Sequence, residues 1–377
     1  MVRAYSKFRG SVRREEGLKV LVVGDWHSEL HEQAVFEALG ELGHEVFAFP
    51  WFQYFRPCVG WLSWLDSLLK RAQNKYLMGP LVSRINRDLL DVAAREQPEL
   101  VFVYRGTHIL PSTLRRIRKV SPRAVIVGYN NDDPFASNQF HRLFKHFLSG
   151  IPDYDLLLAY RHRNLEDFMY AGAKRVHLLR SWFIPERNFP VALDVDEVHD
   201  YGCEVVFVGH YEDDGRVELL EEIVRRGWKL RLFGPGYDWD PIIRHSPELS
   251  PLLPVKLVWG AEYSKALCGA KIALCFFSKL NRDTYTRRCF EIPASKTMLL
   301  SEYTDDLAGL YLEGEEAEFF RSKEEMVSKI EYYLTHDARR EAVAAGGWRR
   351  VHSDGHDVVS RMRDLIQQVE SIQGGRS

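Results

Sequence analysis

Cysteine pairs, long apolar runs and an excess of one charge are all missing from this sequence of 377 residues. Its five cysteines are scattered without a Cys-x-x-Cys pair, which excludes a zinc framework and is typical of a protein from a reducing compartment. No apolar run reaches the roughly 18–20 residues that a transmembrane helix needs, and the N-terminal region has no signal-peptide core. We therefore expect a cytoplasmic protein.

The net charge of −2 gives no whole-protein field that would attract nucleic acid, so we expect no nucleic-acid partner. A full Gly-x-Gly-x-x-Gly fingerprint is also missing after the first predicted strand, residues 19–23, where the chain reads Gly24-Asp25-Trp26-His27-Ser28. This absence argues against a classical dinucleotide site at that end of the chain. The length is too great for one ordinary core and suits two domains.

Buried-strand runs alternate with helical patterns along most of the chain. Residues 1–16 are basic and without periodicity, and we expect a mobile arm there. The next helix is predicted to begin near Leu30, with Ser28 as a plausible N-cap and Gly43 at its end. Further elements follow in alternation, which predicts a parallel sheet with right-handed crossovers. The predicted strands of this half cover residues 45–49, 100–104, 124–129, 155–160 and 175–179, and its later helices cover residues 111–119 and 164–171.

A proline-containing, acidic segment at residues 184–201 predicts a surface connector between two domains. A second alternating set then begins. We predict a first domain over residues 17–190, a second over residues 200–352 and a closing helical segment over residues 353–377. The predicted strands of the second domain cover residues 204–208, 229–233, 255–259, 272–277 and 297–300, and the helices of this half cover residues 215–226, 262–268, 323–335, 338–348 and 356–372.

Residues 276–302 are the stretch around which the second domain is organised. An apolar strand ends in a polar loop, residues 278–286, and a short helix-like piece follows that carries Arg287, Arg288 and Glu291 and is broken near Pro293. Open α/β sheets bind ligands in such loops at the carboxyl ends of their strands. Because the loop offers cations for phosphate and carboxylates for hydroxyls, we interpret it as a nucleotide-sugar site.

The run Arg288-x-Phe290-Glu291-Ile292-Pro293-Ala294, followed by Tyr303-Thr304-Asp305-Asp306-Leu307, resembles the C-terminal signature of the spore-maturation protein B-like glycosyltransferases. The likeness covers roughly residues 200–365. It implies a GT-B fold, with two Rossmann-like domains facing across a cleft and a C-terminal helix that crosses back to the first domain. The family relates to glycosyltransferase families 1 and 4. One departure is Ser295-Lys296, where the family usually has Cys-Gly or Gly-Gly.

The resemblance implies roles for several residues of this stretch. Glu291 would bind the donor ribose, and Asp283, with seven residues between the two, stands where family 4 enzymes have a first glutamate. A carboxylate suits ribose because it accepts two hydroxyl hydrogen bonds at once. Arg288 would bind the diphosphate. From the residues alone, Glu291 could equally cap its helix or pair with an arginine, and Arg288 could form a surface ion pair.

Glycine-containing turns follow two other strands of the second domain, and glycines there permit close backbone approach to a phosphate or a nucleobase. Such turns also occur for purely steric reasons. Tyr237 or Trp239 could stack on the base, or they could belong to the core. The further donor-binding candidates are Gly209, His210, Arg216, Gly234, Gly236, Tyr237 and Thr286.

The catalytic candidates lie in the first domain. Asp25 and His27 directly follow the first strand, where either side chain could deprotonate an acceptor hydroxyl, although His27 could also be an exposed or capping residue. Arg105 and His108 are weaker candidates of the same kind. Asp132, in the loop Asn130-Asn131-Asp132-Asp133-Pro134, could contact the acceptor, hold a divalent metal or form a turn. We expect no bound metal, because GT-B enzymes generally need none.

An aromatic-rich insertion covers residues 50–97 and includes Trp51, Trp61 and Trp64. One helical face, formed by Trp61, Trp64, Leu65, Leu68 and Leu69, is predicted to pack against the sheet or against a second subunit. The alternative is peripheral membrane contact through the Trp51–Trp64 region, helped by nearby lysine and arginine side chains.

Together these observations predict a GT-B glycosyltransferase, without a bound cofactor, that moves a sugar from a nucleoside-diphosphate sugar to a glycan, glycolipid or protein acceptor, as in polysaccharide biosynthesis. The Asp283–Glu291 spacing slightly favours retention of the anomeric configuration. A nucleotide-sugar epimerase of the same fold and a non-catalytic binding or coat protein are the rival hypotheses.

Overall fold

The computed structural model describes residues 7–8, 17–57, 63–136 and 142–375, and it divides the chain into two compact units. The N-terminal domain comprises residues 1–180 together with the returning segment 358–377, and the C-terminal domain comprises residues 181–357. The segment 184–201, which the sequence marks as a connector, belongs to the C-terminal domain. Apart from Lys7 and Phe8, the predicted mobile arm lies outside the described residues.

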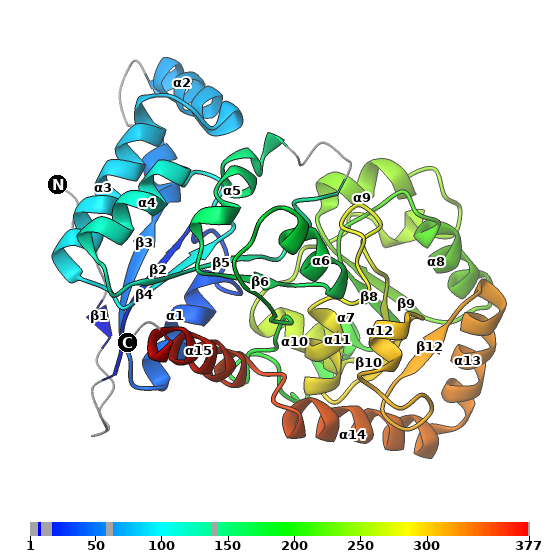
Figure 1. Cartoon of the computed structure of the whole chain (residues 1–377). Helices are drawn as coiled ribbons and strands as arrows, with labels where there is room; N and C mark the ends of the chain where they lie inside the picture. Colours follow the sequence, from blue (N-terminus) through cyan, green and yellow to red (C-terminus); the bar gives the residue numbers. More distant parts are fainter. Residues whose placement is uncertain (1–6, 9–16, 58–62, 137–141, 376–377) are drawn as a thin grey trace. The chain divides into compact units, whose positions relative to one another are not determined.

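The N-terminal domain is built on a seven-stranded sheet with the order β1-β3-β2-β4-β5-β6-β7 (Figure 1). All neighbouring strands are parallel except β1, which is antiparallel to β3. Continuous apolar runs form the central strands, as expected for a sheet that helices cover on both faces. The strands are β1 (Lys7–Phe8), β2 (Lys19–Gly24), β3 (Glu45–Pro50), β4 (Leu100–Tyr104), β5 (Val125–Asn130), β6 (Leu156–Ala159) and β7 (Val176–Leu178).

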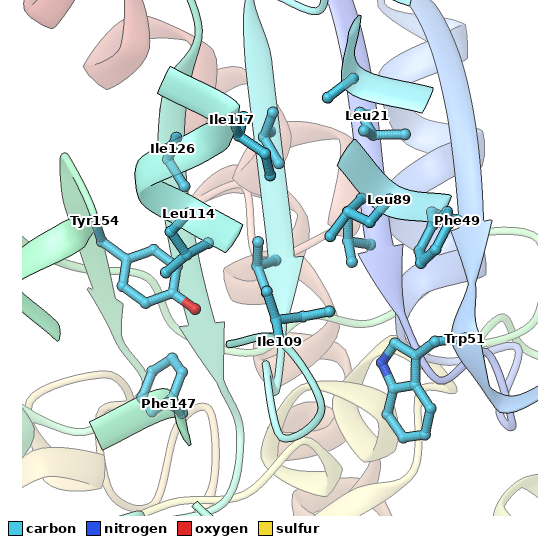
Figure 2. Close-up of a cluster of buried hydrophobic side chains, with 14 of the residues drawn as sticks. Leu21, Phe49, Trp51, Leu89, Ile109, Leu114, Ile117, Ile126, Phe147 and Tyr154 are labelled. Carbon is cyan, nitrogen blue, oxygen red and sulfur yellow. The ribbon is translucent and has the colours of Figure 1, made fainter. Parts of the chain in front are cut away.

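With the exception of α2, the helices of this domain bury apolar side chains in its core. Figure 2 shows part of this core, in which Phe49 and Trp51 pack near Leu89, and Ile109 lies near Leu114. The helices are α1 (Glu32–Glu41), α2 (Ser63–Tyr76), α3 (Pro80–Glu96), α4 (Pro111–Val120), α5 (Lys145–Ser149), α6 (His162–Tyr170) and α15 (Val358–Gly374), and a short 3-10 helix, η1, covers Trp51–Phe55.

The closing helix α15 returns to the N-terminal domain, as the GT-B resemblance implies, and packs against α1. Asp364 on this helix accepts a hydrogen bond from His177 over 2.9 Å, and Gln373 donates one to the carbonyl of Glu99. The prediction for α1 is only partly correct, because the helix begins after His31 and Ser28 is not its N-cap.

Helix α2 does not pack on the sheet, which was one of two predicted alternatives for its apolar face. No residue of α2 is buried within the chain, and Trp64, Leu68 and Leu69 are each more than half exposed. Burial against a second subunit stays a prediction. Trp61 lies outside the described residues. Trp51, in contrast, is buried in the core. No helix in the described part of the chain is long and apolar enough to cross a membrane.

The C-terminal domain is built on a five-stranded, wholly parallel sheet with the order β12-β11-β10-β8-β9. The strands are β8 (Cys203–Val208), β9 (Leu230–Phe233), β10 (Ala270–Cys275), β11 (Met298–Glu302) and β12 (Glu318–Phe320). The helices are α7 (Val195–Tyr201), α8 (Arg216–Arg225), α9 (Gly236–Ile243), α10 (Ala261–Cys268), α11 (Arg288–Ala294), α12 (Asp305–Ala308), α13 (Lys323–Thr335) and α14 (Asp337–Ser353).

The strand predicted at residues 255–259 is wrong. Lys256 forms only an isolated bridge with Phe233, and Leu257 and Trp259 are about half exposed, so the segment leaves the sheet edge at once. The acidic run of the predicted connector also has a different role. Asp194 and Glu197 form a reciprocal capping box at the start of α7. The acidic side chains that the sequence suggests as part of a linker therefore cap a helix.

Candidate functional site

In the C-terminal domain, the loops after β8 and β10 meet at Gly209 and Arg288. A Cβ atom on residue 209 would lie 2.7 Å from Nη1 of Arg288, so only glycine lets this guanidinium approach the turn so closely. The two strands are neighbours in the parallel sheet, and their carboxyl ends therefore share one edge. Two residues that are 79 positions apart in the sequence (288 − 209) are thus brought together, as the sequence predicts.

The Arg288 guanidinium is half-buried and has no carboxylate within ion-pair distance among the residues that the structure describes. Its Nη2 donates a long hydrogen bond of 3.4 Å to the carbonyl of Phe276, and its buried Nε has no hydrogen-bond partner in the described chain. The guanidinium also lies over the ring of Phe207, 5.8 Å from the ring centre. A half-buried cation without a carboxylate partner is costly, and an anionic ligand would offset that cost.

Glu291 lies one turn further along α11 and is buried. Tyr263 on α10 donates a hydrogen bond of 2.6 Å to its Oε2. Burial raises the pKa of the Glu291 carboxyl, although Arg287, the Tyr263 hydrogen bond and Arg288 all act in the opposite direction. No described residue donates a hydrogen bond to Oε1. Sequence reasoning missed Tyr263, because its distance from Glu291 along the chain follows no recognisable spacing.

Two buried thiols and a threonine lie beneath the start of α11. Cys275 and Cys289 have their sulfur atoms 3.9 Å apart, and the hydrogen bond from Cys289, together with the nearby Arg288 cation, lowers the pKa of Cys275 despite its burial. Thr286, a predicted donor-binding residue, is buried, and its Oγ1 accepts the backbone N–H of Arg288 over 3.1 Å. The threonine hydroxyl therefore positions the helix start that carries Arg288.

Two other predicted donor-binding residues of this domain already have acidic partners. Arg216 is buried and donates from Nε and Nη2 to the two carboxylate oxygens of Asp214, over 2.7 and 2.6 Å. Its Nη1 donates to the carbonyl of His210. The exposed His210 ring in turn pairs with Asp238 over 2.9 Å. The charge of Arg216 is thus neutralised by Asp214, and its side chain holds the loop after β8 in place. Arg288, in contrast, has no such carboxylate partner among the described residues.

The glycine turn after β9 packs against the turn after β8. A Cβ on Gly234 would lie 2.2 Å from the carbonyl oxygen of Gly209, and Trp239 donates its indole N–H to the same oxygen over 2.8 Å. Gly236 is the first residue of α9. Trp239 is fully buried and belongs to the core, whereas Tyr237 is 79% exposed and presents its ring to solvent. Of the two aromatic candidates, only Tyr237 is accessible for stacking.

Asp283 is half-buried in the loop between β10 and α11, and its backbone N–H donates to the carbonyl of Ser278. The start of the same loop is held by Glu302, which accepts the N–H of Phe277 over 2.6 Å and pairs with Lys279 over 2.8 Å. These contacts shape the loop from the end of β11 and keep it at the carboxyl edge of the sheet.

In the N-terminal domain, Asp25 and His27 form a close pair directly after β2. His27 donates from Nδ1 to Oδ1 of Asp25 over 2.6 Å, and the backbone N–H of His27 donates to the same oxygen. This hydrogen bond raises the pKa of His27, against the effect of burial. Burial would raise the pKa of Asp25, but the hydrogen bond and charge of His27 and the charge of Arg105 hold it below its usual value.

Arg105 links this pair to Asp132. Its Nη2 donates to Oδ2 of Asp132 over 2.7 Å, and its Nη1 lies 3.6 Å from Oδ2 of Asp25. The backbone of Arg105 has a φ of 62°, which an arginine rarely adopts. Strands β2, β4 and β5 are adjacent, so their carboxyl ends bring together Asp25, His27 and Asp132, the three predicted catalytic residues.

Glu32, at the start of α1, is a buried member of this cluster that sequence reasoning missed. It accepts the backbone N–H of Asp25 over 2.9 Å, and burial, with repulsion from Asp25, raises its pKa to about 7. A signal was present, because Glu32 shares a helical face with the apolar residues Val35 and Leu39. An acidic side chain on the apolar face of a helix that packs on a sheet is expected to be buried with that face.

Two further residues near this cluster have structural roles. The weak candidate His108 is buried, its ring lies 4.0 Å from that of Trp51, and burial lowers its pKa to about 3, so it is a neutral core histidine. Asp133, which adjoins Asp132, is fully buried and accepts hydrogen bonds from the N–H of Phe135 and from Asn164. The adjacent carboxylates of Asp132 and Asp133 therefore face different partners.

Two parallel α/β domains with a returning C-terminal helix define the GT-B fold of glycosyltransferases. Residues 216–367 match the model of a family described as glycosyl transferase-like. No curated protein sequence matches the chain significantly. The match to this glycosyl transferase-like family lies in the C-terminal half of the chain and agrees with the class that the sequence predicts, whereas the narrower likeness to spore-maturation protein B stays a prediction.

Solved structures show the same fold over nearly the whole chain. HepE from Anabaena, in complex with UDP-glucose, is 11% identical with a TM-score of 0.63, and the match covers 94% of this chain and 100% of that one. A glycosyltransferase from Rickettsia africae is 10% identical with a TM-score of 0.66, covering 95% and 99%. Sucrose-phosphate synthase from Thermosynechococcus elongatus is 10% identical with a TM-score of 0.62, covering 94% and 99%.

Proposed function

We propose that this protein is a glycosyltransferase that moves a sugar from a nucleoside-diphosphate sugar to a hydroxyl group of a glycan, glycolipid or protein acceptor. The observation that carries the proposal is Arg288, a half-buried guanidinium that lies against the Gly209 turn without a carboxylate partner among the described residues. A diphosphate supplies the missing negative charge in a geometry that suits the guanidinium fork.

The other proposed contacts to the donor are arranged around Arg288. Glu291 accepts hydrogen bonds from the ribose hydroxyls, and Tyr263 fixes the orientation of its carboxylate. The turns at Gly209 and Gly234 allow the backbone to approach the nucleotide, and the exposed ring of Tyr237 stacks on the base. His210, Gly236, Asp283 and Thr286 complete the proposed donor site, and Arg216 supports its loop.

The N-terminal domain supplies the acceptor side of the reaction. With Nδ1 of His27 bonded to Asp25, its Nε2 is the atom that takes the proton of the acceptor hydroxyl. The hydroxyl oxygen bonds to the anomeric carbon as the bond from that carbon to the diphosphate oxygen breaks. Arg288 stabilises the negative charge that develops on the departing diphosphate. Arg105 and Asp132 position the acceptor beside His27.

The stereochemistry separates two versions of this mechanism. Direct displacement with His27 as the base inverts the anomeric configuration, whereas the Asp283–Glu291 spacing favours retention. The anomeric configuration of the product, read by NMR, decides between them. Incubation of a nucleotide sugar without any acceptor gives no new sugar isomer if the protein is a transferase, and it does if the protein is an epimerase.

Calorimetry with a panel of nucleoside diphosphates tests the donor site. We expect one of them to bind, Arg288→Met to weaken that binding by about 2 kcal/mol, or about 30-fold, and Glu291→Gln to weaken it by about 1 kcal/mol. Arg225→Met, which removes an equal charge from an exposed ion-paired arginine of α8, is the matched control and leaves binding unchanged. If no nucleoside diphosphate binds the parent protein, the protein is a non-catalytic member of the fold.

A further inference from the structure

Helix α2 is attached to the N-terminal domain by its polar side. Asp66 and Lys70 form an ion pair of 2.8 Å on that side, and Lys70 also donates to the carbonyl of Arg56 over 2.7 Å. Gln73 accepts the backbone N–H of Leu81 over 2.8 Å. A surface helix normally does the reverse and buries its apolar stripe. The orientation of α2 therefore turns its apolar side to the solvent.

The outward side of α2 exposes several large apolar side chains. The exposed fractions are 66% for Trp64, 57% for Leu68, 55% for Leu69 and 58% for Tyr76. Side chains at these spacings lie on one face of a helix. A contiguous apolar patch of this kind on a protein surface marks an interaction site rather than ordinary surface variation. We call it the α2 face; it comprises Trp64, Leu65, Leu68, Leu69, Ala72 and Tyr76.

The charges beside the α2 face have one sign. Arg71 and Lys75 are both exposed at its edge, and neither forms an ion pair with any residue that the structure describes. Asp66, the only carboxylate of α2, is on the opposite side of the helix and is paired with Lys70. Whatever covers the α2 face thus meets apolar side chains together with two uncompensated cations.

We propose that the α2 face binds the surface of a bilayer that contains anionic phospholipid. Leu65, Leu68 and Leu69 enter the boundary between headgroups and acyl chains, and Trp64 and Tyr76 lie at headgroup depth, where amphipathic rings are enriched. Arg71 and Lys75 neutralise lipid phosphates. A second copy of the chain is a poorer occupant, because a two-fold symmetric contact would oppose like cations on the two copies.

Flotation of the full-length protein with vesicles tests this surface. We expect binding to vesicles of phosphatidylcholine mixed with phosphatidylglycerol, weaker binding to pure phosphatidylcholine, and loss of binding to the mixed vesicles at high salt. Leu68→Ser with Leu69→Ser should weaken vesicle binding at least about tenfold, because each leucine loses burial in the bilayer. Arg71→Gln with Lys75→Gln should remove the preference for the anionic lipid.

The matched control is Met169→Ser with Tyr170→Ser, which removes two exposed apolar side chains from α6 of the same domain. This control should bind vesicles as the parent does. All the substitutions are at exposed positions, so thermal unfolding should be unchanged and a loss of binding reports on the surface itself. Failure of the parent to float, or equal flotation of the Leu68/Leu69 variant, overturns the proposal. So does a dimer, measured by light scattering, that the same variant converts to monomer.

Discussion

Both domains have polar loops at the carboxyl edges of their parallel strands, but the charged side chains of these loops are paired differently. In the N-terminal domain, Arg105 lies between Asp25 and Asp132, and His27 completes the pairing. In the C-terminal domain, Arg288 has no carboxylate partner within the described chain. The first cluster pairs its arginine with carboxylates, whereas the second leaves the half-buried Arg288 cation for a ligand to neutralise.

This difference in charge pairing indicates which cluster is better suited to bind a charged ligand. Paired groups stabilise the fold and can orient a neutral hydroxyl, because their hydrogen bonds are already directed. An unpaired buried cation weakens the fold and becomes favourable only when an anion arrives. The comparison thus supports the proposed transfer, in which the charged donor would bind the C-terminal domain and an uncharged acceptor group would bind the N-terminal domain.

The most severe test replaces each arginine by methionine, which keeps the unbranched stem and removes the charge. We expect Arg105→Met to lower the free energy of unfolding by about 3 kcal/mol, because it leaves two largely buried carboxylates close together without their cation. Arg288→Met should leave stability unchanged or raise it. Urea unfolding of both variants and the parent, without nucleotide, measures the two values. Equal destabilisation by the two changes would abolish the contrast between the domains.

A smaller effect is expected from Glu32, whose carboxylate is buried beside Asp25. Its pKa of about 7 in the folded protein is above the ordinary 4.5, so the stability that its protonated form contributes is complete below pH 4.5 and is lost as the pH rises to about 7. Glu32→Gln should therefore match the parent near pH 4.5 and exceed it by about 3 kcal/mol at pH 8. Glutamine keeps the acceptor for the N–H of Asp25.

Unfolding by urea at both pH values measures this difference. Glu41→Gln, an exposed glutamate at the far end of α1, is the control and should show no such pH-dependent gain. Asp25 contributes in another window, since its lowered pKa makes its stabilisation disappear only as the pH falls through the acid range. A Glu32→Gln variant that is less stable than the parent at pH 8 would show that the carboxylate is ionised and well solvated in the fold.

The central strands were predictable because parallel strands covered on both faces are continuous apolar runs, whereas the short strands β1 and β12 were not predicted. β4 and α13 lie at the predicted residues, and β2 extends one residue further. Helix α9 was not predicted, because Pro235 and Pro241 look like helix breakers although the first precedes the helix. Proline at a helix start is compatible with the helix, and only tertiary packing decides whether a later one is tolerated.

The candidate site was predictable to the extent that topology determines it. Asp25 and Asp132 come together because the strands before them are adjacent in a parallel sheet. Pairing of side chains could not be predicted in the same way. Arg216 and Arg288 look equivalent in sequence, and only the fold shows that Asp214 holds the first while the second has no such partner among the described residues. The tertiary structure therefore decides which of the two arginines lacks an acidic partner, and the sequence does not show it.

The two clusters also differ in where the backbone is strained. We expect the release of this strain to have the smallest effect on the free energy of unfolding. Lys296 has a φ of 58°, and the N–H groups of Lys296 and Thr297 close the end of α11 on the carbonyls of Pro293 and Ile292, as in a Schellman motif. A glycine would adopt this backbone conformation without strain. Lys296→Gly should raise the free energy of unfolding by about 1 kcal/mol.

In the N-terminal cluster the strained residues are Arg105 itself and Trp26, which lies between Asp25 and His27, whereas Lys296 lies at the opposite end of α11 from Arg288. Lys296→Gly should therefore change stability and leave nucleotide affinity as in the parent, measured by urea unfolding and calorimetry on the same preparation. Lys296→Ala, which removes the charge but keeps the Cβ, is the matched control and should bring no such gain. A change in nucleotide affinity in both variants would instead make the Lys296 ammonium a second phosphate-binding cation.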